Sequence, residues 1–186
     1  MSEIVGLVLA GGLARRMGGV DKGLQLWRGQ PLALHVLQAL RPQADRLLVS
    51  ANRHLDAYAA FGAPVLADPA DLAFAGPLAG MLAGLATLGD DDWLLTAPCD
   101  SPHPPPDLAA RLLEAARPHG LAYAHAAREH PTHALLHARL REPLAEYLRD
   151  GGRAVLRWMQ ARAHGVARFD DEAAFTNLNQ LADLHG

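Results

Sequence analysis

The stretch LAGGLARRMGGVDKG, residues 9–23, begins within the end of an aliphatic run at residues 4–10. That run stops at the Gly11–Gly12 pair. A continuous apolar run of this length predicts a strand buried on both faces, as in a parallel sheet. The glycine-rich stretch would then leave the carboxyl end of that strand, which is the edge where open α/β sheets bind ligands. Both the fold class and the position of the site follow from this junction.

The rest of the chain alternates between short apolar runs and segments with helical periodicity. Further strands are expected at residues 46–51, 64–67, 93–97, 121–125, 133–138 and 165–169. Helices are expected from Pro31 to near Pro42 and at residues 54–61, 77–88, 106–117, 141–149 and 153–162, with a helical turn near the C-terminus. This alternation predicts an α/β fold: a three-layer, Rossmann-like, open and mostly parallel sheet with helices on both faces.

The composition is that of an ordinary globular domain. Of the 186 residues, 50% are hydrophobic and 20% charged, with 17 basic and 20 acidic side chains and a net charge of −3. We therefore expect a single domain over residues 1–186 and no nucleic-acid partner. One cysteine, Cys99, excludes an intramolecular disulfide, and no apolar stretch approaches the roughly 18 residues of a membrane span. A cytoplasmic location, away from membranes, is the simplest expectation.

The glycine-rich stretch has the composition of an anion-binding loop. Five of the thirteen residues from Gly11 to Gly23 are glycine and three are arginine or lysine. Glycines let backbone N–H groups approach phosphate oxygens, and basic side chains supply the counter-charge. A P-loop is excluded because Lys22 is followed by Gly23 rather than Ser or Thr, and the spacing does not fit a dinucleotide fingerprint. A basic surface loop without a ligand remains the alternative.

Two acidic residues come directly after expected strands. Asp100 follows the strand at 93–97, where a carboxylate would face the glycine-rich loop and could hold Mg²⁺ against phosphates. Asp68 closes the strand at 64–67. Each could instead be a turn residue next to proline. Asp21, inside the loop, is interpreted as a charge partner that orders Arg16 or Lys22.

With its variable positions left open, the loop reads LAGGxxxRMGGxDKG, which resembles the nucleotide-binding signature of molybdenum cofactor guanylyltransferases. These belong to a larger group with a nucleotide-diphospho-sugar transferase-like fold. The resemblance continues through SANR at 50–53, Asp68, GPLAG at 76–80, PCDSP at 98–102, HPT at 130–132 and NLN at 177–179.

This resemblance implies a transferase that moves GMP from GTP to the terminal phosphate of molybdenum-bound molybdopterin, with Mg²⁺ as cofactor and pyrophosphate as the second product. It implies catalytic roles for Lys22, Arg16 and Asp100, with Asp100 as the metal ligand. The implied nucleotide-binding residues are Leu9, Ala10, Gly11, Gly12, Lys22, Ser50, Asp68 and Asp100. Gly80, Asn177 and Asn179 would contact the molybdopterin substrate. Asp68 would accept hydrogen bonds from the guanine base.

The sequence also departs from the family pattern and leaves alternatives open. Ser50 stands where the resemblance implies Asn, and Gln180–Leu181 replaces the usual Thr-Pro after the asparagine pair. That pair could be turn residues.

Guanine is preferred over cytosine because the loop begins LAGG and residues 76–80 look guanylyl-type, but a cytidylyltransferase remains the close alternative. The alternative from another functional class is a non-catalytic adaptor that binds the nucleotide or the cofactor. Molybdoenzyme chaperones or cofactor-insertion proteins are possible partners.

Ten histidines suggest a zinc site, above all His130, His133 and His137, but Pro131 prevents one helical ligand face. They are interpreted as surface or core residues, although His133 and His137 could share a strand face. Cys99 is expected to be a buried structural thiol. Ser101 lacks the surroundings of a nucleophilic serine, and Trp158–Met159 are expected in the core.

Overall fold

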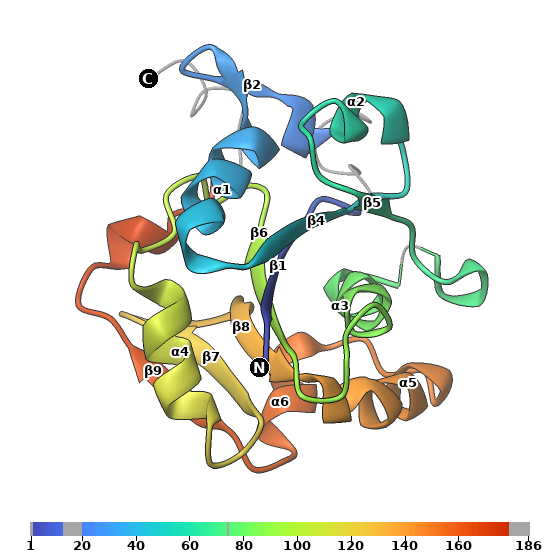
Figure 1. Cartoon of the computed structure of the whole chain (residues 1–186), viewed down its shortest axis with the longest axis vertical. Coiled ribbons are helices and arrows are strands. Elements are labelled where there is room, and N and C mark those ends of the chain that lie inside the picture. The colour runs from blue at the N-terminus through green and yellow to red at the C-terminus, as the bar shows by residue number, and fades with distance from the viewer. Residues whose placement is uncertain (1, 13–19, 74, 179–186) are drawn as a thin grey trace.

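The computed structural model describes residues 2–12, 20–73 and 75–178. Its centre is a seven-stranded sheet with strand order β5-β4-β1-β6-β8-β7-β9 (Figure 1). β8 runs antiparallel to both of its neighbours, and every other pairing in this sheet is parallel. The expected mostly parallel α/β sheet is therefore confirmed.

The elements lie close to their expected positions. The strands are β1 Ile4–Leu9, β2 Leu26–Trp27, β3 Gln30–Pro31, β4 Arg46–Ser50, β5 Val65–Leu66, β6 Trp93–Pro98, β7 Leu121–His125, β8 Glu129–His137 and β9 Gly165–Arg168. The α-helices are α1 Leu32–Leu40, α2 Leu55–Ala59, α3 Pro77–Leu85, α4 Leu108–Ala116, α5 Arg141–Arg149 and α6 Val155–Gln160. Short 3₁₀ helices include η2 Lys22–Leu24 and η6 Glu172–Phe175.

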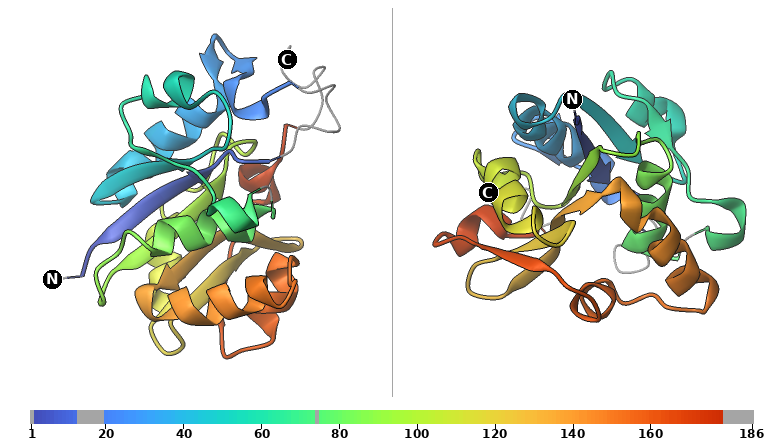
Figure 2. Two further views of the ribbon diagram at one scale, coloured as in Figure 1. Left: turned by 90° about the vertical axis from the view of Figure 1, so that its right-hand side faces the viewer. Right: turned by 60° about the horizontal axis from the view of Figure 1, so that its bottom comes forward.

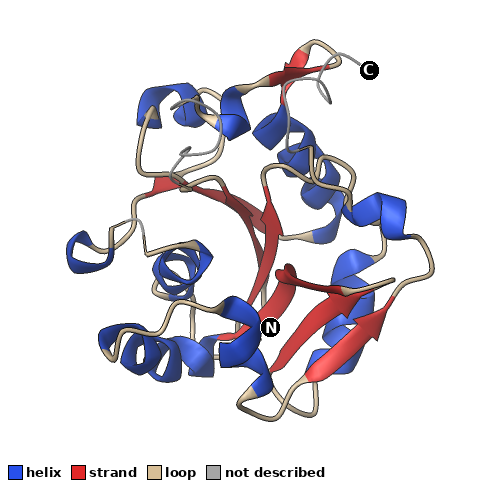
Figure 3. Ribbon diagram, turned by 180° about the vertical axis from the view of Figure 1, so that it is seen from behind, coloured by secondary structure: helices blue, strands red, loops and turns tan. Residues whose placement is uncertain are grey.

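Helices cover both faces of the sheet, as Figures 2 and 3 show. One core cluster joins the sheet to α1, α2 and α4, and the other joins it to α3, α5 and α6, where Trp158 and Met159 are buried as expected. Alternate residues of β1 enter opposite clusters, Leu7 on one side and Val8 on the other. A strand buried on both faces reads as a continuous apolar run, which is why residues 4–10 predicted this one. No helix in the described ranges is long and apolar enough to cross a membrane.

The order of the strands creates a crevice beside β1. The chain builds β1, β4 and β5 outward in one direction and then returns to place β6 on the other side of β1. At such a reversal the connections leave neighbouring strands toward opposite faces, which opens a space at their carboxyl ends. Gly11 and Gly12 after β1 and Asp100 after β6 lie at this edge.

The sequence did not predict the small hairpin of β2 and β3, which lies apart from the main sheet (Figure 1). Its two-residue turn places Arg28 at φ 49° and Gly29 at φ 79°, as a type I′ turn requires. Arg-Gly is not the Asn-Gly or Asp-Gly pair that signals this turn, so the hairpin was missed. The helix expected to begin at Pro31 begins at Leu32, because Pro31 is still extended.

Strand β8 begins at Glu129, four residues before the predicted start at 133. Its pairing with β7 jumps from Ala124↔His130 to Tyr123↔Ala134, so residues 131–133 form a bulge. Pro131 fits there because a bulged residue need not donate to the ladder. The predicted start was wrong because the bulge cannot be recognised without the strand pairing. Several helices are also shorter than predicted. The clearest case is α6, which spans Val155–Gln160 where 153–162 was predicted.

Candidate nucleotide-binding site

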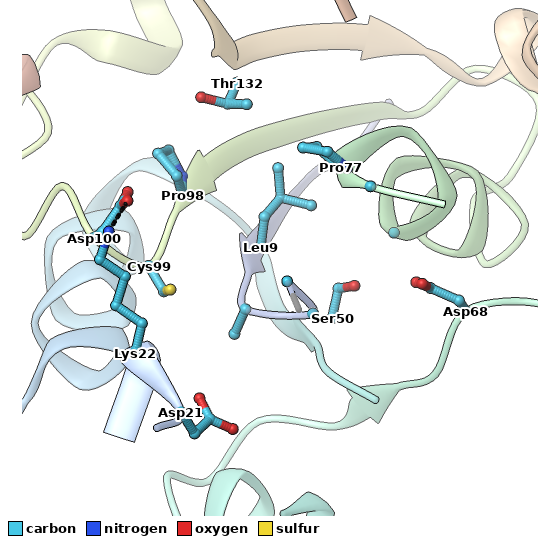
Figure 4. A pocket seen from close by; sticks show the side chains of 15 residues that line it. Leu9, Asp21, Lys22, Ser50, Asp68, Pro77, Pro98, Cys99, Asp100 and Thr132 are labelled. Carbon is cyan, nitrogen blue, oxygen red and sulfur yellow. Dashed lines mark hydrogen bonds and ion pairs between the residues drawn. The ribbon is translucent and has the colours of Figure 1, made fainter. Parts of the chain in front are cut away.

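A pocket with a cavity volume of about 210 Å³ opens at the carboxyl edge of the sheet (Figure 4). The lining residues are Leu9, Ala10, Gly11, Gly12, Asp21, Lys22, Ser50, Asp68, Gly76, Pro77, Gly80, Pro98, Cys99, Asp100 and Thr132. The structure thus brings together every predicted nucleotide-binding residue and also Gly80.

The strand register explains how these residues meet. Leu9 is level with Ser50 in β4 and with Pro98 in β6, and Ser50 is level with Leu66 in β5. Two residues beyond each of these positions are Gly11, Asn52, Asp100 and Asp68. One row across four parallel strands therefore holds two carboxylates, a loop glycine and an amide. In Figure 4, Asp100 and Asp68 lie at opposite ends of the pocket.

At one end of the row, Lys22 and Asp100 form an ion pair. Lys22 Nζ lies 2.8 Å from Asp100 Oδ2, and both side chains are three-quarters buried or more. Asp100 Oδ1 is fully buried and has no hydrogen-bond partner within the described part of the chain. Buried polar atoms normally have partners, so this oxygen is available to a ligand that is not part of the protein.

Asp21 makes a contact that the sequence did not predict. Its Oδ1 accepts a hydrogen bond of 2.5 Å from the buried hydroxyl of Tyr58 in α2. Burial, followed by this bond to a carboxylate, raises the pKa of Tyr58 far above its ordinary value, so the hydroxyl keeps its proton. The Tyr58 ring also fills the space beside Gly23, where a Cβ would overlap the hydroxyl. Asp21 thus anchors the Lys22 segment to α2, and the second expected partner, Arg16, lies outside the described residues.

At the other end of the row, Asn52 holds Asp68. Asn52 Oδ1 accepts from the backbone N–H of Asp68 at 2.8 Å, and Asn52 Nδ2 donates to Asp68 Oδ2 at 2.8 Å. The same Nδ2 donates to the carbonyl of Gly11 at 3.3 Å. Asn52 was not predicted as a site residue. The available signal was its position two residues beyond a strand, which Asp68 and Asp100 share.

Ser50 and Gly80 fit against each other in the middle of the pocket. A Cβ on Gly80 would overlap Ser50 Oγ and would lie 3.2 Å from Leu9 Cδ2. Ser50 is buried, with 2% of its surface exposed. Helix α3 can therefore approach the sheet this closely only because position 80 has no side chain.

Thr132 lines the pocket from the β8 bulge and was not predicted as a site residue. Its carbonyl accepts a hydrogen bond of 2.8 Å from Thr96 Oγ1 in β6. Bulges redirect side chains next to binding sites, but this one could not be read from the sequence without knowledge of the strand pairing.

Asn177 does not line the pocket. Its Oδ1 accepts a hydrogen bond of 2.6 Å from Ser101 Oγ, and the next backbone N–H, that of Leu178, donates to the carbonyl of Asp100 at 2.8 Å. The segment thereby attaches the end of the described chain to the residues after β6. Asn179 lies outside the described residues.

The histidines near the pocket form a buried aromatic cluster. His130 stacks on Phe175, and His133 meets the same ring edge-on. His130 Nε2 lies 3.0 Å from Glu172 Oε2, whereas both ring nitrogens of His133 are buried without a partner in the described part of the chain. Burial lowers the pKa of His133 to about 3. In the described ranges no three His, Cys, Asp or Glu side chains are placed to hold a metal ion.

Cys99 is 8% exposed, and burial raises the pKa of its thiol well above the ordinary value. A protonated thiol is a poor nucleophile, which agrees with the structural role expected for this residue.

Comparison with known proteins decides the family. The model of the MobA-like NTP transferase domain matches residues 6–165. This chain belongs to the MobA-like NTP transferase family. The molybdenum cofactor guanylyltransferase of Acidovorax ebreus (strain TPSY) is 48% identical over 98% of this chain and 94% of its own. The protein of the same name from Ralstonia pickettii (strain 12J) is 47% identical over 99% and 95%.

Solved structures share the fold of this family member at lower identity. Molybdopterin-guanine dinucleotide biosynthesis protein A from Archaeoglobus fulgidus has a TM-score of 0.76 and 20% identity, over 97% of this chain and 95% of its own. The 2-C-methyl-D-erythritol 4-phosphate cytidylyltransferase of Thermus thermophilus has a TM-score of 0.71 and 20% identity, over 96% and 94%. All residues that line the pocket fall within the matched 6–165, whereas Asn177 lies beyond it.

Proposed function

We propose that this MobA-like transferase moves GMP from GTP to the terminal phosphate of molybdopterin, which yields the guanine dinucleotide cofactor and pyrophosphate. The observation that carries the proposal is the pocket in which Gly11 and Gly12 lie between the Lys22–Asp100 pair and Asp68. The proteins named molybdenum cofactor guanylyltransferase support it, since they match almost the whole chain.

The chemistry needs little from the protein beyond positioning and charge. A phosphate oxygen of the pterin attacks the α-phosphorus of GTP, the new P–O bond forms, and the bond to the β-phosphate breaks with pyrophosphate as leaving group. This nucleophile is already ionised near neutral pH, so no general base is required. Lys22 and Arg16 neutralise the triphosphate, and the N–H groups of Gly11 and Gly12 orient it. The N–H of Ala10 does not take part, because it donates to the carbonyl of Ser50 at 2.8 Å.

Asp100 has the features expected of a magnesium ligand. Its buried Oδ1 has no partner in the described ranges, and carboxylate oxygens are the protein ligands that Mg²⁺ takes alongside waters and phosphate oxygens. When bound, the ion supplies positive charge across the phosphates. Asp100 would hold it through Oδ1, and Lys22 already fixes the direction of the same carboxylate through Oδ2.

Asp68 recognises the base at the far end of the pocket. Guanine presents adjacent N1–H and N2–H donors, and a carboxylate is the matching acceptor. Ser50 completes the nucleotide contacts, with a shorter reach than Asn would have. Gly80 contacts the molybdopterin substrate inside the pocket, and Asn177 and Asn179 contact the part of it that extends outside. The enzyme works in the cytoplasm and passes its product to molybdoenzyme chaperones or insertion proteins.

The decisive experiment measures pyrophosphate release with molybdopterin and, in turn, GTP, CTP, ATP and UTP, each with Mg²⁺ and with a chelator. We expect turnover with GTP that stops when Mg²⁺ is removed. A clear preference for CTP would identify a cytidylyltransferase, and nucleotide binding without pyrophosphate release would identify an adaptor. Turnover that survives chelation would remove Mg²⁺ from the proposal.

A further inference from the structure

Asn52 joins the Asp68 end of the pocket to Gly11, at the start of the glycine-rich loop, although it does not line the pocket. Its amide makes three hydrogen bonds, two to Asp68 and one to the carbonyl of Gly11. Asp68 lies sixteen residues away and Gly11 forty-one, so neither contact is local. One half-buried side chain therefore connects the base end of the pocket to the phosphate-binding loop.

The sheet register makes this connection possible. Asn52 follows β4, which lies between β1 and β5, and it is level with Gly11 on one side and with Asp68 on the other. Adjacent parallel strands are about 4.8 Å apart. A residue on the middle strand can therefore reach both neighbours with a short amide, which one on β1 or β5 could not.

The two bonds to Asp68 close a ring that fixes the direction of its carboxylate. The backbone N–H of Asp68 can only donate, so the Asn52 atom that faces it is the acceptor Oδ1. The Nδ2 group then points toward two acceptors, Asp68 Oδ2 and the carbonyl of Gly11. Because every contact is satisfied in one orientation of the amide, that orientation is determined.

We propose that Asn52 is a positioning residue for base selection, which orients the Asp68 carboxylate toward the adjacent N–H donors of a guanine base. The inference rests on the function proposed above. Asn52 acts through Asp68 rather than by contact with the nucleotide. Its third bond, to Gly11, keeps the base end and the phosphate loop at a constant separation.

The test compares GTP with ITP, whose base lacks the 2-amino group and so offers one donor fewer. In Asn52→Ala and the milder Asn52→Ser, the carboxylate loses its orientation. We expect KM for GTP to rise about 10- to 100-fold, the cost of a lost hydrogen bond to a charged group, while kcat changes less than about threefold. The preference for GTP over ITP should fall in parallel. Asn52→Asp, which sets two carboxylates against each other, should be worse than Asn52→Ala.

Gln43→Ala is the matched control. Gln43 is another bridging amide, bonded to the carbonyls of Ala39 and Pro105 and to the N–H of Ala109, away from the pocket. Its loss should lower the melting temperature without a change in the GTP-to-ITP preference. If the Asn52 variants also lose only stability, the positioning role is wrong and Asn52 is structural.

Asp68→Ala separates the inference from the function on which it rests. If the wild type does not prefer GTP, or if Asp68→Ala leaves KM for GTP unchanged, the base assignment fails and this inference fails with it. If both behave as proposed while Asn52→Ser keeps the wild-type KM and preference, only the inference fails. In the Asp68→Ala background, Asn52→Ala should add no further loss of preference, because the group that it orients is gone.

Discussion

Thr132 and His133 are neighbours in the same bulge, yet they belong to regions with opposite character. Thr132 lines the open pocket, where Lys22 pairs with Asp100 and Asn52 holds Asp68. His133 packs against Phe175 in a closed cluster, with both ring nitrogens unpartnered in the described part of the chain. Polar residues at a sheet edge thus form a binding site only where an open space remains beside them. Enclosed by aromatic rings, they become part of the core.

The largest expected effect tests the charged end of the pocket. Asp100→Ala or Lys22→Ala should lower turnover about 10²- to 10³-fold, the usual cost of one preorganised electrostatic contact in a transition state. Steady-state kinetics with GTP measures it. The control is Asp107→Ala, which removes an exposed carboxylate paired with Arg111 and should stay within about twofold of wild type. Near-normal turnover in both pocket variants would show that Asp100 and Lys22 contribute no more to turnover than an exposed carboxylate does.

A second, smaller effect concerns the anchor of the Lys22 segment. Tyr58→Phe deletes the donor to the buried Asp21 carboxylate and should lower the free energy of unfolding by about 2 kcal/mol. Urea denaturation measures this. Tyr147→Phe is the control, because its hydroxyl makes only a long, exposed bond to the carbonyl of Ala154. Equal stability losses in the two variants would show that the Tyr58–Asp21 bond contributes no more to the free energy of unfolding than an exposed hydrogen bond.

The fit of α3 against the sheet gives a third prediction. Gly80→Ala should destabilise the protein by about 1–2 kcal/mol, since overpacking against Ser50 and Leu9 exceeds the roughly 1 kcal/mol that alanine gains in a helix. Ser50→Ala should recover part of this loss in the double variant, and a double-mutant cycle by urea denaturation measures the coupling. Strictly additive effects would contradict the close contact.

The smallest effect belongs to the histidine cluster. His133→Leu removes two unpartnered buried nitrogens and should raise the free energy of unfolding near pH 7 by about 1 kcal/mol. His130→Leu, which removes one of the partners of Glu172, should lower it instead. A loss of stability in His133→Leu would indicate that His133 has a polar role after all.

His133 also has a consequence for acid stability. Its pKa is about 3 in the folded protein and about 6.5 in the unfolded chain, so between these values only the unfolded chain takes up the proton. The free energy of unfolding therefore falls as pH decreases through this window, by up to about 1.4 kcal/mol per pH unit. His133→Leu should make the slope shallower, as denaturation between about pH 4 and 7 would measure.

The sequence alone determined the fold class and most of the pocket. Strands buried on both faces must be apolar throughout, and a loop that binds anions needs glycines, so residues 4–23 carried both signals locally. Asp68 and Asp100 could be found because each directly follows an apolar run. These features depend on neighbours in the chain and are therefore visible in it.

Only the tertiary structure decided which of these side chains act on one another. Asn52 beside Asp68, Tyr58 beneath Asp21, Ser50 against Gly80 and Thr132 from a bulge all depend on strand register and helix approach between segments far apart in sequence. A shift of one residue in register would turn each strand-end side chain to the other face. Packing likewise decided that His130 and His133 belong to the core, since the sequence does not show that Phe175 lies against them.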